Sequence, residues 1–165
     1  MLELYIIRHG LAGKPLEDVN LDEERPLTKK GKERMKAIAK GLDEMGIAFD
    51  VVVSSPLTRS KETAEIVDKY CSDADIVYTD LLKPGATYDP LIDYLNGLTD
   101  KEKVAIVGHE PFLSGFVSYC LAKSKNSFIK LKKGGILALE MEGALKPGQC
   151  KLAWLMEPWQ LEELA

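Results

Sequence analysis

The feature that most constrains this chain is a set of short apolar runs without polar alternation. Val51 to Val53 and Val104 to Val107 contain only apolar residues, most of them β-branched. Such runs are typical of strands buried on both faces, as in a parallel sheet. The sequence therefore predicts a sheet of about six strands. The other runs of strand length are 2–7, 76–78, 136–141 and 152–156.

Helical patterns alternate with the first four runs. Thr28 is predicted to cap a helix whose apolar residues fall on one face and which Gly46 can end. Ser55-Pro56, Asp89-Pro90 and Glu110-Pro111 predict three more helix starts, because a polar cap followed by proline suits a first turn. The sequence therefore predicts a three-layer α/β domain over residues 1–165, with a mostly parallel central sheet and helices on both faces.

The stretch from Gly10 to Pro26 lacks a clear helix or strand pattern and is rich in charged and turn-forming residues. We predict a loop there. A loop of this length in a compact domain is usually functional or mobile.

Charge and composition exclude several classes of protein. Lys plus Arg number 22 and Asp plus Glu 26 in 165 residues, so the net charge is -4. This disfavours binding to nucleic acid or to anionic membranes. The first residues lack the basic start and long apolar stretch of a secretory signal, and no run approaches the length of a membrane span. Three widely spaced cysteines suggest reduced thiols in the cytoplasm and no structural zinc.

The chain has two histidines, His9 and His109, and each directly follows a predicted buried strand. In open α/β sheets, the carboxyl ends of the strands form the ligand crevice. We therefore expect the two imidazoles to meet there. The alternative is that each is a satisfied turn residue beside its neighbouring glycine.

The chain has 18 lysines and four arginines, so its solvated surface uses mainly lysine. An arginine is therefore expected to stand where its planar, bidentate guanidinium group is needed. Arg8 precedes His9, and Arg59 lies in the first turn after the second strand, so both can point into the crevice. Arg34 is interpreted as part of a solvated face. Arg25 is expected to pair with Glu23 or Glu24, or else to edge the pocket.

Two arginines, two histidines and nearby helix N-termini predict a positive, donor-rich pocket that suits a phosphoryl group. The sequence has neither a carboxylate cluster for Mg²⁺ nor a GxxxxGK[ST] loop. We therefore expect no metal and no cofactor. The basic block at 29–32 is interpreted as surface.

These residues resemble a known family. Arg8-His9-Gly10 after an N-terminal strand, the segment Ser54 to Arg59, Thr63-Ala64-Glu65, and Gly108-His109-Glu110-Pro111 follow the pattern of the histidine phosphatase (phosphoglycerate mutase-like) superfamily. The resemblance extends from Leu2 to about Leu155. Chain length, Ala12 and Arg25-Pro26-Leu27-Thr28 make it most similar to the small SixA-type phosphohistidine phosphatases.

The resemblance implies a metal-independent phosphatase in which His9 is the nucleophile. Neutral imidazole attacks phosphorus, and the resulting phosphohistidine is labile to water. In the family, a backbone carbonyl accepts the proton of the other ring nitrogen. Arg8, Arg59 and a protonated His109 would hold the phosphoryl oxygens, and Glu110 is also assigned to substrate binding.

One departure from the family bears on the substrate. Mutases and sugar phosphatases of this superfamily carry a general-acid glutamate on an inserted segment, but residues 81–89 here are short and contain no glutamate. Asp80, Asp89 and Glu110 remain open as acids, although Asp89 is expected to cap a helix. A leaving imidazole, with a free pKa near 6.5, needs little help. A phosphohistidine-bearing protein, such as a phosphotransfer domain, is therefore the expected partner, bound at a shallow, open pocket.

Three alternatives stay open. A small-molecule phosphomonoesterase of the same superfamily would need a carboxylate close to the phosphate site. A non-catalytic phosphate-binding protein would be expected to have lost His9 or an arginine. A flavodoxin-like receiver or nucleotide domain is disfavoured because no acidic cluster follows the first strand. Phosphate, tungstate or vanadate is expected to bind between Arg8, His9, Arg59 and His109.

Overall fold

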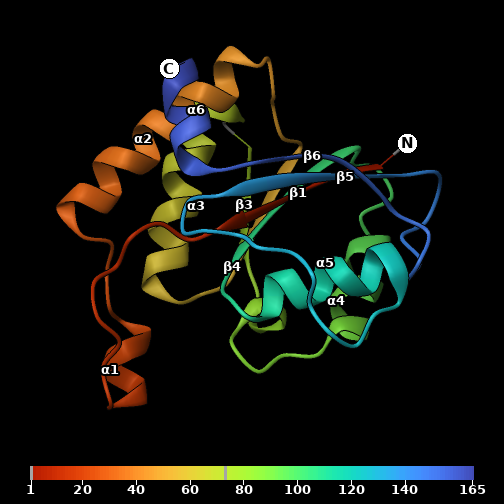
Figure 1. Ribbon diagram of the computed structural model, residues 1–165, viewed down its shortest axis with the longest axis horizontal. Coiled ribbons are helices and arrows are strands. Elements are labelled where there is room, and N and C mark those ends of the chain that lie inside the picture. Colours follow the sequence, from red (N-terminus) through yellow and green to blue (C-terminus); the bar gives the residue numbers. More distant parts are fainter. Residues whose placement is uncertain (1, 73) are drawn as a thin grey trace.

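The computed structural model describes residues 2–72 and 74–165, and a six-stranded sheet runs through its centre (Figure 1). The spatial order is β3-β2-β4-β1-β5-β6. The first four of these strands are parallel, whereas β5 is antiparallel to both β1 and β6. The predicted mostly parallel sheet is confirmed. The strands are β1 (Leu2–Arg8), β2 (Val51–Ser54), β3 (Ile76–Tyr78), β4 (Lys103–Gly108), β5 (Ile136–Met141) and β6 (Lys151–Met156).

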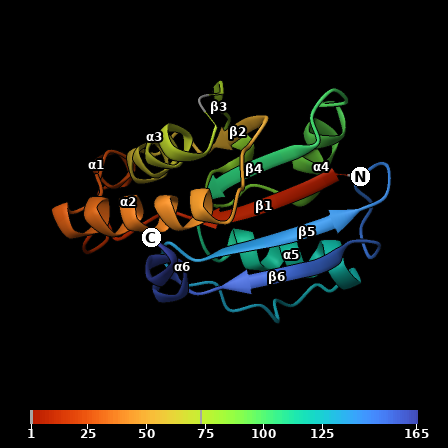
Figure 2. The same ribbon diagram turned by 90° about the horizontal axis from the view of Figure 1, so that it is seen from above.

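Helices cover both faces of the sheet, as Figure 2 shows from above. One apolar cluster joins α2, α3 and α6 to one face, and a second joins α4 and α5 to the other. Neighbouring β1 residues such as Ile6 and Ile7 belong to different clusters, so this strand is buried on both sides. The helices are α1 (Val19–Glu23), α2 (Lys29–Glu44), α3 (Thr58–Cys71), α4 (Tyr88–Asn96), α5 (Phe112–Ala122) and α6 (Pro158–Leu164), with a 3-10 turn, η1, at Asp80–Leu82.

Helix starts agree only in part with the caps predicted from sequence. Thr28 does cap α2, since its side chain accepts from the Gly31 amide. However, α3 begins at Thr58, so Ser55-Pro56 is not its start. The N-cap of α4 is Thr87, and Asp89 lies inside the first turn, so the predicted Asp89 cap is wrong. The starts of α3 and α4 each differ from the prediction by two positions, which is a normal uncertainty for helix ends.

Two helices were not expected. The stretch 10–26 contains α1, whose N-cap Asp18 accepts from the amides of Asn20 and Leu21. The chain also ends in α6, which begins with a capping box between Glu157 and Gln160. Both helices are short, so neither leaves a long periodic pattern in the sequence.

The C-terminal helix also corrects the interpretation of Arg34. Its guanidinium makes two hydrogen bonds to Glu162 Oε1, at 2.7 and 3.1 Å, and so joins α2 to α6. The partner of Arg34 is 128 residues away in sequence, so no local pattern predicts this pair.

The thiols of Cys71, Cys120 and Cys150 are buried and free. Across residues 2–72 and 74–165, the helices are all too short or too polar to cross a membrane.

Candidate active site

The sheet register brings the two histidines together. β1 and β4 are parallel neighbours in which Arg8 pairs with Gly108, so both strands end at the same level. The next residues are His9 and His109, whose ring centroids lie 5.2 Å apart. The His9 amide donates to the Gly108 carbonyl at 3.0 Å, which fixes the two strand ends relative to each other. The predicted meeting of the histidines at the carboxyl ends of the strands is confirmed.

His9 is held in one tautomer. Its Nδ1 lies 2.7 Å from the carbonyl oxygen of Gly10, which can only accept, so Nδ1 carries the hydrogen and Nε2 keeps its lone pair. Burial lowers the pKa of His9 to about 4, the Gly10 carbonyl opposes this, and the positive charges of Arg59, Arg8 and Lys133 lower it further. His9 is therefore neutral at pH 7, as a nucleophile must be.

His109 is also neutral. Burial, followed by the charges of His9, Arg59, Arg25 and Arg8, lowers its pKa to about 3. These surroundings therefore favour a neutral His109, whereas the family resemblance implies a protonated His109 that donates to the phosphoryl group. An arriving dianion would reverse this balance, because an opposite charge favours the protonated form.

The contacts of His109 nevertheless leave a donor available. Its Nε2 lies 2.8 Å from Ser55 Oγ and 3.2 Å from Ser60 Oγ. Ser55 Oγ also accepts from the Leu57 amide, so its hydroxyl hydrogen is free to point at His109. A neutral His109 that accepts at Nε2 carries its hydrogen on Nδ1, and this buried N–H has no partner within the described part of the chain.

Both arginines are tethered at one end of the guanidinium. Arg8 donates from one terminal nitrogen to the Leu131 carbonyl at 2.9 Å. Arg59 donates to the Asp22 carbonyl at 3.0 Å and has a second nitrogen 3.6 Å from the Asp22 carboxylate. In both residues Nε is buried and without a hydrogen-bond partner.

These unpartnered atoms form a pattern. Over residues 2–72 and 74–165, the buried side-chain nitrogens or oxygens that lack a partner are Arg8 Nε, Arg59 Nε and His109 Nδ1. All three belong to residues that the sequence assigns to phosphate binding. A buried donor without an acceptor costs about 1–3 kcal/mol, so such groups call for an explanation. An anion with several acceptor oxygens would satisfy all three.

The site is more enclosed than the sequence suggested. His9 is 6% exposed, His109 2% and Arg59 6%, which contradicts the expected shallow, open pocket. Asp22 on α1 reaches Arg59, so the 10–26 segment also contacts the site. The 80–89 segment is short, but its shortness does not leave these residues exposed.

Asp22 is the residue that sequence reasoning missed. Its carboxylate accepts from the Leu16 amide and from Arg25 Nε, both at 2.9 Å. These contacts, with the charges of Arg25 and Arg59, lower the pKa of Asp22. The predicted pairing of Arg25 with Glu23 or Glu24 is therefore wrong. The signal that could have found the pair is its i, i+3 spacing on a short helix.

Arg25 also edges the pocket. It donates to the carbonyls of Ala12 and Gly13, and its charge lowers the pKa of His109 and of Arg59. The second of the two sequence interpretations of Arg25 is thus supported by its electrostatic effect on the site.

The carboxylates considered as general acids lie in other contacts. Asp80 is exposed and 3.7 Å from Lys83, and Asp89 accepts from the Tyr119 hydroxyl at 3.1 Å. Glu110 accepts from the Ser114 amide at 2.7 Å and so caps α5. Burial lowers the pKa of Arg8, and the charge of Glu110 partly opposes this. Glu110 therefore lies near the site as a helix-capping charge, and direct contact with substrate remains a prediction.

No group of three or more His, Cys, Asp or Glu residues within the described ranges is placed to hold a metal ion. Metal-independent chemistry therefore stays a prediction for experiment to test.

Two sequence comparisons bear on this site. Residues 4–83 match the model of the histidine phosphatase superfamily (branch 1). An uncharacterized protein of Picosynechococcus is 31% identical over 145 residues, which are 87% of this chain and 87% of that protein. The mitochondrial serine/threonine-protein phosphatase PGAM5 of Xenopus tropicalis is 36% identical over 87 residues, 53% of this chain. This match spans only 30% of the length of PGAM5.

Solved structures share the fold. The protein histidine phosphatase SixA complexed with tungstate superposes with a TM-score of 0.82 at 22% identity, over 97% of this chain and 99% of that one. The alpha-ribazole phosphatase from Shigella flexneri gives 0.73 at 18% identity, over 95% and 97% of the chains. At these identities the likeness concerns the fold, and it spans phosphatases whose names indicate quite different substrates.

Proposed function

The chain belongs to the histidine phosphatase superfamily, and on that premise we propose that it hydrolyses phosphohistidine on a partner protein through a phosphorylated His9. The observation that carries the proposal is the set of three buried, unpartnered nitrogens on Arg8, Arg59 and His109. These donors suit the equatorial oxygens of a phosphoryl group, whose charge they would stabilise during transfer.

The chemistry proceeds in two displacements. The lone pair on Nε2 of His9 attacks phosphorus while the bond from phosphorus to the substrate imidazole breaks. The leaving imidazole takes up a proton from solvent, and Nδ1 of His9 keeps its hydrogen bond to the Gly10 carbonyl. Water then attacks the phosphorus of phosphorylated His9, which releases inorganic phosphate and restores the neutral ring. No metal is called for, because the arginines and His109 supply the positive charge.

Phosphohistidine is favoured over alkyl phosphates by the state of the carboxylates. Asp22 is the carboxylate that contacts Arg59, and it is held ionised by the Leu16 amide and by Arg25. An ionised carboxylate cannot protonate an alkoxide, whereas general-acid assistance is worth about 10²–10⁴-fold in rate. A leaving imidazole depends far less on such help.

A small-molecule phosphomonoesterase is the second candidate, and the enclosure of the site favours it. His9 and His109 are only 6% and 2% exposed, so a compact substrate would reach them more readily than a protein surface. In this case Asp22 would have to leave Arg25 to act as an acid.

A hydrolysis panel separates the two candidates. It compares kcat/KM for a phosphohistidine-bearing protein, an aryl phosphate, 3-phosphoglycerate and a sugar phosphate, each with and without EDTA. We expect the phosphohistidine protein to be hydrolysed fastest, the aryl phosphate next, and EDTA to have no effect. Faster hydrolysis of the alkyl esters would replace the proposal with the second candidate, and loss of activity in EDTA would refute the metal-free mechanism.

A further inference from the structure

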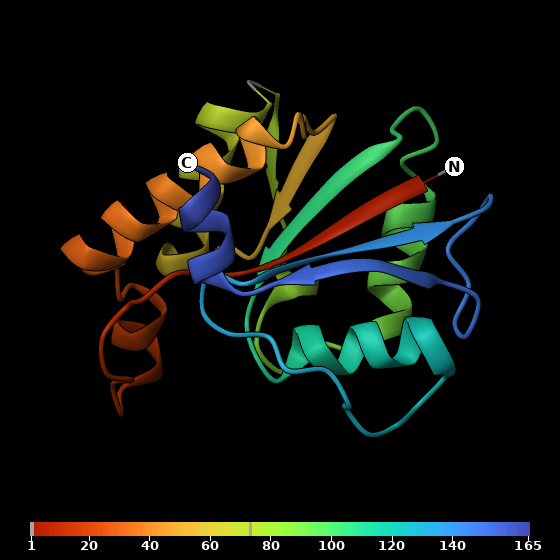
Figure 3. The same ribbon diagram turned by 45° about the horizontal axis from the view of Figure 1, so that its top comes forward.

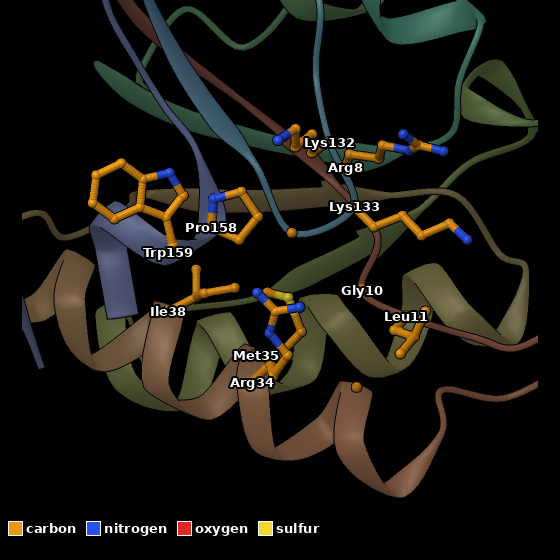
Figure 4. A pocket seen from close by; sticks show the side chains of 12 residues that line it. Arg8, Gly10, Leu11, Arg34, Met35, Ile38, Lys132, Lys133, Pro158 and Trp159 are labelled. Atoms are coloured by element: carbon orange, nitrogen blue, oxygen red, sulfur yellow. The ribbon is translucent and has the colours of Figure 1, made fainter. Parts of the chain in front are cut away.

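A pocket of about 420 Å³ lies beside the histidine pair and has no role in the mechanism above. It is formed by α2, α6, the loop at 132–134 and the turn after β1, as Figure 4 shows. Its volume is within the range of specific binding sites. It shares Arg8 with the phosphate site, and Gly10, which follows His9, is part of its wall. The pocket is therefore a direct extension of the candidate active site.

The floor and one side of the pocket are apolar. Met35 and Ile38 of α2 are almost fully buried beneath it. Pro158 and Trp159 stand together on one side, and Leu11 lies on the other (Figure 4). The Trp159 side chain is 58% exposed, which is unusual for so large an apolar group.

Trp159 is nevertheless held in place. Its Nε1 donates to Glu157 at 2.9 Å. The helix that carries it is anchored by buried Leu161 and by the Arg34–Glu162 ion pair. An exposed tryptophan on a fixed helix is a typical anchor at protein interfaces, because little side-chain entropy is lost when a partner covers it.

The charged residues that line the pocket are all basic, and two of them form ion pairs with glutamates. Its described lining includes Arg8, Arg34, Lys132 and Lys133 and contains no acidic residue. Arg34 is paired with Glu162, and Lys132 with Glu157. Lys133 makes no ion pair with the described residues, is exposed, and extends on the side of Gly10 and Leu11 (Figure 4). Its charge also acts on His9, so Lys133 lies near His9 as well as on the pocket wall.

We propose that this pocket binds an acidic segment of the phosphohistidine-bearing protein, with a carboxylate at Lys133 and an apolar side chain against Trp159. The inference rests on the proposed function and specifies which partner surface the enzyme selects. Charge complementarity supports it, because a positive pocket next to the phosphate site favours a partner whose phosphohistidine is flanked by acidic residues. The apolar floor adds a requirement for a large apolar residue on the same segment.

The test uses two phosphohistidine peptides of equal length. One carries glutamates and a leucine next to the phosphohistidine, and the other carries glutamines in place of the glutamates. We expect the wild-type protein to hydrolyse the acidic peptide with a kcat/KM about tenfold higher, as for one good charge contact. Equal kcat/KM values for the two peptides would overturn the proposal.

Matched variants locate the effect. We expect Lys133→Gln to reduce the preference for the acidic peptide to about twofold or less. Trp159→Ala should lower kcat/KM for the acidic peptide about tenfold more than for an aryl phosphate, which cannot reach the far side of the pocket. The controls are Lys146→Gln, an exposed lysine in the turn before β6, and Leu164→Ala, an exposed residue of α6 outside the pocket. The assignment would be contradicted if the control variants lost as much kcat/KM for the acidic peptide as Lys133→Gln and Trp159→Ala do. It would also be contradicted if Trp159→Ala lost as much kcat/KM for the aryl phosphate as for the acidic peptide.

A binding measurement separates this inference from the proposed function. The exposed indole of Trp159 reports on occupancy of the pocket by fluorescence, with Trp159→Ala as the blank. If neither phosphopeptide is hydrolysed while the aryl phosphate is, the phosphohistidine proposal fails. In that case tighter binding of the unphosphorylated glutamate peptide than of the glutamine peptide would still support the pocket assignment, and equal or no binding would overturn it.

Discussion

The two flanks of the histidine pair are built differently. On one side, α1 has no buried residue, exposes Leu16, Val19 and Leu21 around it, and projects from the body of the protein (Figures 1 and 3). It reaches the site through polar contacts of Asp22. On the other side, α6 is packed on α2 through buried Leu161 and carries the pocket wall.

This difference concerns mobility. Segments with few buried apolar contacts open at low free energy, whereas packed elements open only with the core. We therefore expect the α1 flank, which contacts Arg59, to open more readily than the α6 flank.

The largest effect on activity is expected for His9, because no residue of either flank can replace the nucleophile. His9→Ala removes the nucleophile and should lower kcat by at least about 10³-fold. Unfolding by urea should be little changed, since the ring sits at a strand end outside both apolar clusters. In the wild type, a trapped phosphoryl group should be acid-labile and map to His9. Substantial turnover by the variant would refute the nucleophile assignment.

The second largest effect on activity is expected for Arg59, which connects the histidine pair to α1 through Asp22. Arg59→Ala removes a buried donor aimed at the transferred group and should lower kcat/KM for the aryl phosphate about 10²–10³-fold. It should also release α1, which would be seen as faster hydrogen exchange at residues 16–23. Arg34→Ala serves as the control for losing an arginine, and a comparable rate loss there would contradict the assignment.

The free energy of unfolding should depend on pH because of the two buried histidines. His9 and His109 have pKa values lowered to about 4 and about 3, while in the unfolded chain each titrates near 6.5. As pH falls below about 6.5, the unfolded state binds protons that the folded state does not, so stability falls by up to about 1.4 kcal/mol per pH unit for each histidine. Urea unfolding between pH 7.5 and 4.5 measures this slope.

His109→Asn removes one of the two titrating imidazoles and should therefore remove the contribution of one proton from the slope of unfolding free energy against pH. A slope that is already absent in the wild type would mean that water reaches the histidines freely. The α1 flank would then be open most of the time, and the contrast between the flanks would be sharper than the structure indicates.

Asp22 tests the α1 flank by itself. Asp22→Ala removes the carboxylate that orients Arg59 and should lower kcat/KM about threefold to tenfold through KM, with Asp22→Asn intermediate. Asp18→Ala is the matched control, because it removes the α1 cap but keeps the contact with Arg59. A rise in kcat/KM for Asp22→Ala would instead make α1 an inhibitory contact.

The smallest effect is expected on the fixed flank. Glu162→Gln breaks the ion pair that joins α6 to α2 and should cost about 0.5–1 kcal/mol of unfolding free energy. Glu163→Gln, next to it and exposed, should cost nothing measurable. If Glu162→Gln frees α6 enough to raise its hydrogen exchange to the level of α1, the two flanks do not differ in the way described.

The strands could be predicted because their signals are local. The apolar runs at 51–53 and 104–107 marked strands buried on both faces, and residues following such strands reach the same crevice in any parallel sheet. That reasoning located His9 and His109 from sequence alone, and the arginines stood out because the surface uses lysine. The resemblance to the family added the order of the motifs.

The enclosure of the site, by contrast, depends on contacts between distant residues. No local pattern indicates that Asp22 would reach Arg59 or that Arg34 would bind Glu162.

The sequence by itself determined the sheet and the strand ends at which His9 and His109 meet, because each depends on residue type and short-range periodicity. Only the tertiary structure decided the charge of those groups, the cover over them and the pocket beside them. These properties arise from burial and from pairs such as Arg59–Asp22, whose partners are 37 residues apart and meet only once the chain is folded.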